Sequence, residues 1–348
     1  MRISDFEYDL PEELIAQHPV VPRDASRLLV LHRDSGEIEH RRFRDLPAYL
    51  REGDLLALND TRVIPARLLG YKAETGGQAE LLLLQTTGSD SWEAMARPGR
   101  RLHPGNVLVF GDDELRAEIL SVTPGGGRVV RLVPGPRAGG RTVHDLLHAL
   151  GELPLPPYIT HGPPPAERDV YQTIYARWEG SSAAPTAGLH FTEEIFAQLE
   201  ARGVRRACVT LHVGMGTFKP VQVEDVEEHE IHQEVFSVSP EAAQAINATK
   251  AAGGRIVSVG TTSTRTLESA ADKAGTVHAM TGATRLFIVS GYHFKVVDVQ
   301  LTNFHLPRST LLLLISAFAG RENVLRAYRE AVQQRYRFLS FGDAMLII

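Results

Sequence analysis

The segment between residues 71 and 140 differs in its sequence pattern from the residues on either side. It constrains the fold more than any other part of the chain. It holds short apolar runs at close spacing, separated by turns rich in Gly and Pro. Such runs are typical of the strands of a small β-barrel or sandwich. We expect strands at residues 79–85, 92–96, 106–110, 115–122 and 128–133. Because helical patterns occur on both sides, we interpret the segment as a domain inserted into an α/β host.

The flanking parts alternate between strand-like and helix-like runs. Strands are expected at 28–31, 55–58, 204–213, 255–260, 285–289 and 296–301, and helices at 142–150, 170–177, 192–202, 308–319 and 321–337, after Ser239 and from about Ser263. This alternation implies a mainly parallel sheet or a (βα) barrel. The predicted fold is therefore α/β, with a barrel-like main domain of residues 1–68 and 151–348. A small β-barrel domain of residues 69–150 is inserted into it.

Length and composition indicate a two-domain globular protein. The 348 residues exceed what one core usually supports. Acids and prolines stand at the N-terminus where a signal peptide needs basic and apolar residues, and the apolar run 311–319 is far shorter than a bilayer span of about 20 residues. We expect a cytoplasmic monomer with no membrane partner. The single cysteine, Cys208, excludes an internal disulfide and is expected to be a core thiol.

The net charge of −5 argues against a protein that binds nucleic acid with its whole surface. One local basic face is still predicted, because Arg326, Arg329 and Arg337 fall on one side of the expected helix 321–337. A solvated helix face would give the same pattern.

Five polar loops, each marked by glycine or turn residues, are expected on one face of the host. Ligands bind at the carboxyl ends of strands in α/β proteins. Hydroxyl groups and amides at a helix start suit a carboxylate or phosphate. The loops hold Asp60 and Arg62; residues 179–192; His212 beside Gly214 and Gly216; Thr261, Thr262 and Arg265; and Asn303, His305 and Arg308.

Residues 179–192, EGSSAAPTAGLHFT, are the most unusual of these loops. Such small residues cannot fill a core, and their glycines let a backbone approach a ligand closely. Thr192 is expected to cap the helix that follows. A long surface turn is the alternative interpretation.

Residues 229–234, HEIHQE, place His229 and His232 near Glu230 and Glu234. They could ligate a metal or form a hydrogen-bonded acid–base cluster. The spacing is not the HExxH of zinc peptidases, so the acid–base cluster is favoured. Ser181 or Ser182 with His190 as a serine hydrolase fails, because no GxSxG elbow follows a strand.

Eleven segments along the whole chain resemble the S-adenosylmethionine:tRNA ribosyltransferase-isomerases of queuosine biosynthesis, in family order. They are QHPVVPRDASRLL (17–29), LNDTRVIPARL (58–68), ARPGRRL (96–102), LPLPPYI (153–159), YQTIYAR (171–177), EGSSAAPTAGLHFT (179–192), LHVGMGTFKPV (211–221), HEIHQEVF (229–236), VGTTSTRTLES (259–269), TNFHLPRSTLL (302–312) and FGDAML (341–346).

The resemblance implies a chemistry that composition does not reveal. S-adenosylmethionine would serve as a ribosyl donor and co-substrate, and the other substrate would be a tRNA with 7-aminomethyl-7-deazaguanine at the wobble position. Ribosyl transfer and rearrangement would give epoxyqueuosine, adenine and methionine. The family fold is an α/β barrel-like domain with an inserted β-barrel. No metal and no permanently bound cofactor are expected.

We assign hypothetical roles by residue type. The acid–base residues would be His212, His229, Glu230 and His232; the residues that bind S-adenosylmethionine would be Glu179, Gly180, Ser181, Thr186, Gly188, His190, Thr261, Thr262 and Arg265; and those that bind the tRNA would be Asp60, Arg62, Asn303, His305, Arg308, Arg326 and Arg329. Arg265 with the two threonines would hold the methionine carboxylate. The alternatives are a metal-dependent hydrolase built on His212, His229 and His232, and a non-catalytic RNA-binding module.

Overall fold

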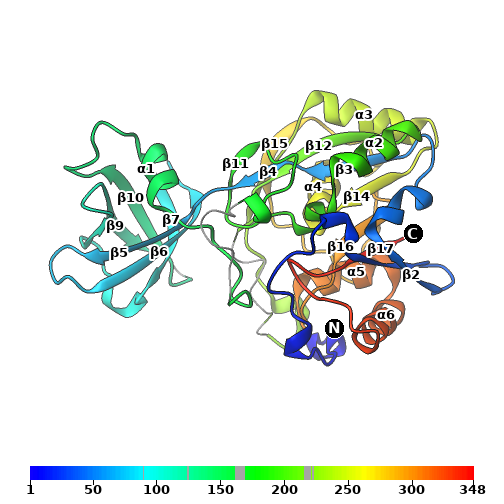
Figure 1. The fold of residues 1–348 in the computed structure, drawn as a ribbon, viewed down its shortest axis with the longest axis horizontal. Helices are drawn as coiled ribbons and strands as arrows, with labels where there is room; N and C mark the ends of the chain where they lie inside the picture. The colour runs from blue at the N-terminus through cyan, green and yellow to red at the C-terminus, as the bar shows by residue number, and fades with distance from the viewer. Residues whose placement is uncertain (89, 124, 161–168, 215–220, 222) are drawn as a thin grey trace. The chain divides into compact units, whose positions relative to one another are not determined.

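The chain forms two compact units in the computed structural model, which describes residues 1–348 except 89, 124, 161–168, 215–220 and 222 (Figure 1). The first unit consists of Met1–Thr61, Pro157–Trp178 and Ala184–Ile348, and the second of Arg62–Pro156 and Glu179–Ala183. The predicted α/β class with an inserted β-barrel is confirmed. The predicted boundaries at residues 68 and 151 remain predictions.

Six antiparallel strands of the second unit close into a barrel. Buried residues alternate with more exposed ones along β9 and β6, which is the period of a sheet with one face in a core. Leu81, Leu108, Phe110 and Ile119 are among the residues that fill this core. In barrel order the strands are β10 (Arg128–Pro134), β7 (Ser91–Arg97), β6 (Gln78–Thr86), β5 (Arg67–Lys72), β8 (Val107–Phe110) and β9 (Leu115–Val122), and helix α1 (Val143–Leu150) follows β10.

A nine-stranded sheet forms the first unit. Its strand order is β15 (Met280–Thr284), β13 (Glu234–Val238), β12 (Arg205–Leu211), β3 (Leu55–Asn59), β14 (Ile256–Val259), β16 (Val299–Asn303), β17 (Ala344–Ile347), β1 (Arg27–Leu31) and β2 (Ile38–Arg42). A separate two-stranded sheet pairs β4 (Thr61–Val63) with β11 (Trp178–Ser181).

The centre of the large sheet is parallel, and its margins are mostly antiparallel, with one parallel pair between β17 and β1. Strands β12, β3, β14 and β16 run in one direction, and every residue of β3, β14 and β16 is buried. Burial on both faces is typical of parallel strands covered by helices. Antiparallel pairing joins β13 to β12 and β17 to β16. The sheet is therefore mixed, where the sequence predicted a mainly parallel sheet or a (βα) barrel.

Hydroxyl side chains cap most helices of the first unit. Thr192, the predicted cap, accepts a hydrogen bond from the backbone of α2 (Glu193–Ala201). Ser239, after which a helix was expected, does so for α3 (Pro240–Ala251), and Ser309 for α5 (Thr310–Ala319). The other helices are α4 (Thr261–Ala270) and α6 (Arg321–Gln333), and the 3-10 helices are η1 (Ile3–Phe6), η2 (Glu12–Leu14), η3 (Arg23–Ala25), η4 (Phe43–Tyr49), η5 (Gly99–Arg101), η7 (Thr186–His190) and η9 (Val226–Glu228). None of the helices in the described part of the chain is long and apolar enough to cross a membrane.

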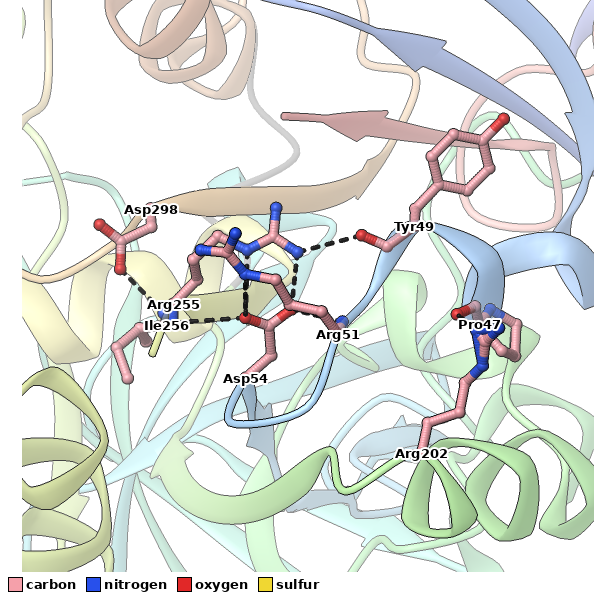
Figure 2. A network of polar contacts seen from close by, with 8 residues as sticks. All are labelled: Pro47, Tyr49, Arg51, Asp54, Arg202, Arg255, Ile256 and Asp298. Carbon is pink, nitrogen blue, oxygen red and sulfur yellow. Dashed lines mark hydrogen bonds and ion pairs between the residues drawn. The ribbon is translucent and has the colours of Figure 1, made fainter. Parts of the chain in front are cut away.

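The amino ends of the parallel strands form a closed polar network around Asp54, which Figure 2 shows. The fully buried Asp54 carboxylate accepts hydrogen bonds from Arg255 Nη2 at 2.6 Å and from Arg255 Nε at 3.1 Å. Arg255 also donates to the backbone oxygen of Tyr49 at 3.0 Å, and Asp298 accepts from Ile256 N at 2.8 Å. A buried carboxylate with this many donors is satisfied internally, so this edge of the sheet serves stability.

Three elements differ from those expected from the sequence, and so does the exposure of the single cysteine. Residues 285–289 lie outside any strand, and residues 170–177 form only short turns. Helix α4 begins at Thr261, not near residue 263. Its N-cap, Gly260, has φ +86° and, within the described chain, no side-chain cap, so hydroxyl-based capping rules gave no signal there. Cys208 is exposed, because it falls on the outward side of β12 rather than in the core.

Candidate functional site

The carboxyl ends of the parallel strands place four of the predicted loops of the first unit at one edge of its sheet. Asn59, at the end of β3, donates from Nδ2 to Leu211 O at 3.0 Å and to Thr262 Oγ1 at 3.1 Å. Its Oδ1 accepts from Leu211 N at 3.0 Å. Asn59 thus holds the ends of β3 and β12 against the start of α4. Because β12 and β14 flank β3 on opposite sides, this edge is a switch point of the kind where α/β sheets bind ligands.

A hollow of about 80 Å³, which we call the first hollow, lies at this edge. It has room for several water molecules. Alanine, leucine, proline and phenylalanine side chains supply much of its wall, and a few polar groups converge on it, as in small-molecule sites. The predicted site residues that line it are Thr186, Thr261, Thr262, Asn303 and His305.

Asn303 lines the first hollow and carries a buried hydrogen-bond acceptor. Its amide is 3% exposed, and Nδ2 donates to Leu339 O at 3.1 Å and to His190 Nε2 at 3.3 Å. A carbonyl oxygen only accepts, so the nitrogen of the amide must face Leu339. Among the described residues, Oδ1 then has no hydrogen-bond partner. Since a buried acceptor without a partner costs free energy, this atom is suited to a ligand that donates.

His190 holds Asn303 in place and is itself neutral. Burial lowers the pKa of His190 to about 3. With Nε2 accepting from Asn303, the ring proton lies on Nδ1, which donates to Ser26 Oγ at 2.8 Å. The ring also stacks on Phe43, with centroids 5.0 Å apart. Ser26, His190 and Asn303 therefore form one oriented chain of hydrogen bonds behind the first hollow.

His305 and His212 are also held as neutral rings. Burial lowers the pKa of His305 to about 3, and its Nε2 lies 2.9 Å from Thr302 Oγ1. His212 follows β12, and its Nδ1 lies 2.8 Å from Thr61 Oγ1. Burial lowers the pKa of His212 as well. Each ring is therefore available at neutral pH as a neutral hydrogen-bonding group, not as a cation.

The other predicted histidines line a second hollow, which has a volume of about 30 Å³. His229, His232, Glu234 and Arg265 line it, together with apolar residues of the loop after β15 and of α5. Burial and the nearby His232 lower the pKa of His229. Glu230 is exposed. Leu311 lines both hollows, so they are neighbours.

Arg265 is the buried cation of the second hollow. The residue is 7% exposed; Nη1 is paired with Glu234 and Nε donates to Leu286 O at 3.1 Å. Among the described residues, Nη2 has no hydrogen-bond partner. The sequence grouped Arg265 with Thr261 and Thr262, whereas the structure places these threonines in the first hollow and Arg265 in the second.

The loop 179–192 is divided between the units and is not a surface turn. Glu179, Gly180 and Ser181 belong to the second unit, and residues from Ala184 onward belong to the first. Of its predicted residues only Thr186 lines the first hollow, while Gly188 and His190 are buried. A Cβ at Gly188 would collide with the hydroxyl of Tyr175. This glycine is therefore needed for a contact within the protein, not for the approach of a ligand.

The predicted tRNA-binding residues are dispersed. Asp60 is buried, accepts from Thr210 Oγ1 at 2.6 Å and has a pKa raised by burial. Arg62 lies 3.9 Å from Glu179. Arg308 lies 3.8 Å from both Glu7 and Glu224. On α6, Arg326 donates to Gly36 O and Arg329 is exposed. Arg337, which was predicted on the same helix face, lies beyond the end of α6.

The metal-hydrolase alternative finds no support. Within the residues that the structure describes, only His144, His148 and Glu179 bring three possible ligand atoms within 4.8 Å of one another. His229 and His232 line the second hollow, and His212 is not among its lining residues.

Several residues at the hollows were missed by the sequence reasoning. Ser26 precedes β1 rather than following a strand, so the rule of strand ends did not select it. Leu339, Ser340 and Tyr158 line the first hollow from irregular segments. Leu339 has φ +68°, which is rare for a bulky residue and lets its carbonyl face Asn303. Resemblance gave the available signal, since Ser26 and Tyr158 lie inside matching segments.

Comparison with known proteins agrees with this arrangement. The model of a family described as queuosine biosynthesis protein matches residues 3–347. Two relatives named S-adenosylmethionine:tRNA ribosyltransferase-isomerase, from Symbiobacterium thermophilum and Moorella thermoacetica, are 58% and 56% identical, each over 100% of both chains. The crystal structure of S-adenosylmethionine tRNA ribosyltransferase from Thermotoga maritima matches with a TM-score of 0.56 and 40% identity, over 99% of this chain and 100% of that one.

The match spans both units and includes the strand ends that form the two hollows. The chain therefore belongs to the family of queuosine biosynthesis proteins.

Proposed function

We propose that this chain transfers the ribosyl moiety of S-adenosylmethionine to 7-aminomethyl-7-deazaguanine at the wobble position of tRNA and isomerises it, giving epoxyqueuosine-tRNA, adenine and methionine. Family membership and the shared name of its relatives support this transferase activity. The structural observation that carries the proposal is the buried, unpartnered Oδ1 of Asn303, among the described residues, in a hollow at the switch point of the sheet.

The first hollow suits the adenine of S-adenosylmethionine. The exocyclic amine of adenine is a donor, and Asn303 Oδ1 is an acceptor held in place by His190 and Leu339. Ala187 and Phe304 are among the apolar residues that would contact the ring. A site that leaves a buried acceptor unpaired without its ligand discriminates strongly in favour of a donor.

The second hollow suits the methionyl part of the same molecule. Arg265 lines this hollow and has a buried donor nitrogen, Nη2, without a hydrogen-bond partner among the described residues, which would give a carboxylate a charge-assisted hydrogen bond. Leu286, Ile288 and Leu314 provide an apolar wall for the thioether chain. The two hollows are neighbours at Leu311, and in this proposal one extended ligand reaches past that side chain to occupy both.

We assign His229 as the base that removes the proton next to the sulfonium. It lines the second hollow, and its lowered pKa keeps the ring unprotonated near neutral pH, as a base requires. Replacement of His229 with Ala should lower kcat by about 10²- to 10⁴-fold while the Kd for tRNA stays within twofold. The exposed His293 is the control, and His293→Ala should leave both values unchanged. A normal kcat in His229→Ala would remove this residue from the mechanism.

The activity itself is tested with purified protein, S-adenosylmethionine and tRNA bearing the aminomethyl precursor. We expect equal amounts of adenine and methionine, and a mass increase on the wobble nucleoside that matches the epoxycyclopentane product. tRNA with unmodified guanine at that position is the control and should release no adenine. Release of adenine without a mass change on the tRNA, or methylation of the tRNA, would contradict the proposal.

A further inference from the structure

A cluster of two histidines and one carboxylate lies in the second unit, apart from both hollows in sequence. His144 and His148 are four residues apart on α1, so they project from one side of that helix. Their rings have centroids 4.6 Å apart. Glu179, from β11 of the same unit, lies 3.8 Å from His144 Nδ1 and 3.3 Å from His148 Nε2.

These separations match those of a tetrahedral metal site. Zinc binds nitrogen and carboxylate oxygen at about 2.0–2.2 Å, so two ligand atoms at the tetrahedral angle lie roughly 3.3–3.6 Å apart. Possible ligand atoms of all three side chains lie within 4.8 Å of one another, and the two histidines are exposed and Glu179 is partly exposed, so an ion can reach them. A set of two imidazoles and one carboxylate favours Zn²⁺, Co²⁺ or Ni²⁺ over Mg²⁺ and Ca²⁺, which prefer oxygen ligands.

We propose that His144, His148 and Glu179 bind one transition-metal ion of the Zn²⁺ class. The ion would join α1 to β11 within the second unit, with water in its fourth position. This site is independent of the proposed transferase activity. It gives Glu179 a role other than the contact with S-adenosylmethionine that the sequence suggested.

Arg62 competes for the same carboxylate. Its Nε lies 3.9 Å from Glu179 Oε1, so its charge opposes that of an arriving cation. If the three side chains form only ion pairs with one another and with Arg62, Arg62→Ala should bind Zn²⁺ no more tightly than the unmodified chain. If they form a metal site, Arg62→Ala should bind Zn²⁺ more tightly than the unmodified chain.

The test uses the full-length chain without an affinity tag, stripped with a chelator and titrated with Zn²⁺ by calorimetry. We expect one ion per chain, and a Kd at least tenfold higher in His144→Ala and in His148→Ala. His103→Ala, which removes an exposed histidine of the same unit, is the matched control and should bind like the unmodified chain. Substitution with Co²⁺ should give the visible absorption bands of tetrahedral cobalt.

Thermal unfolding provides a second readout that does not depend on activity. Excess Zn²⁺ should raise Tm by several degrees in the unmodified chain and in His103→Ala, since a ligand that binds only the folded state stabilises it. The increase should disappear in the His144 and His148 variants. An unchanged Kd in both of these variants, or no binding by the stripped protein, would overturn the proposal.

Discussion

At the residue scale, the contrast between satisfied and unsatisfied polar groups distinguishes the two edges of the large sheet. At the amino edge, Asp54 is fully buried and receives donors from its neighbours (Figure 2). At the carboxyl edge, buried polar atoms of Asn303 and Arg265 have no hydrogen-bond partner among the described residues. Native proteins pair nearly all buried polar groups, so the two exceptions that line the hollows, Asn303 and Arg265, are the ones we propose as ligand contacts.

The first prediction concerns Asn303. Asn303→Ala should lower kcat/KM for S-adenosylmethionine by roughly 5- to 150-fold, because a buried donor of the ligand that loses its acceptor costs about 1–3 kcal/mol. Asn303→Asp keeps the acceptor but loses the donor to Leu339, so it should retain part of the activity only if Oδ1 is what the substrate needs. Steady-state kinetics at saturating tRNA measure this. Equal kcat/KM in Asn303→Ala and the unmodified chain would contradict the adenine assignment.

The second prediction concerns the pH dependence of stability. His190 has a pKa near 3 in the folded chain and about 6.5 when unfolded, so the unfolded state binds more protons between these values. The free energy of unfolding should therefore fall as pH decreases below about 6.5, with a slope that approaches 1.4 kcal/mol per pH unit for this group. His190→Gln should reduce the slope between pH 6.5 and 5 in urea titrations. His293→Gln, at an exposed position, should keep it.

At the element scale, strands with alternating burial could be predicted and tertiary exceptions could not. All five expected barrel strands occur, whereas β5 was missed because Arg67 and Gly70 resemble loop residues. Residues 285–289 have the apolar spacing of a strand, but Leu286 and Ile288 line the second hollow instead. Among site residues, those that follow strands were found, and Ser26, which acts through His190, was not. Local patterns carry no information about such remote partners.

The third prediction tests the role of the glycine in η7. Gly188→Ala should destabilise the fold by about 1–3 kcal/mol, because its Cβ would meet the hydroxyl of Tyr175. This hydroxyl is buried and has no hydrogen-bond partner among the described residues, so Tyr175→Phe alone should cost little. The double variant should recover part of the loss, which chemical denaturation would measure; Thr173 Cγ2 and Tyr175 Cζ, at 2.8 and 2.9 Å from the added Cβ, would still have to move. If Tyr175→Phe gave no recovery, the loop would need its glycine for another reason, such as a ligand.

At the scale of the whole molecule, the net charge of −5 requires that tRNA be bound by local basic surface. Each unit offers exposed arginines: Arg329 on α6, and Arg97, Arg100 and Arg101 next to η5. Arg326 is less suited, since it donates to Gly36 O. Most other arginines of the predicted basic helix 321–337 contact other groups of the protein. Arg321, for example, lies 3.8 Å from Asp5.

The last prediction follows from the difference between Arg321, which is paired with an acid, and the exposed Arg329, whose Nε donates, among the described residues, only to the backbone oxygen of Leu325 at 3.2 Å. Arg329→Ala and Arg100→Ala should each weaken tRNA binding and flatten the plot of log K against log salt by about 0.7–0.9, because each loses one phosphate contact and its counterion release. Arg321→Ala is the matched control on α6; its charge is already balanced by Asp5, so its slope should stay close to that of the unmodified chain. Filter binding between about 50 and 200 mM salt measures all three. Unchanged affinity and slope in Arg329→Ala and Arg100→Ala would exclude these surfaces, and tRNA binding would then rest on contacts to the target base in the hollows.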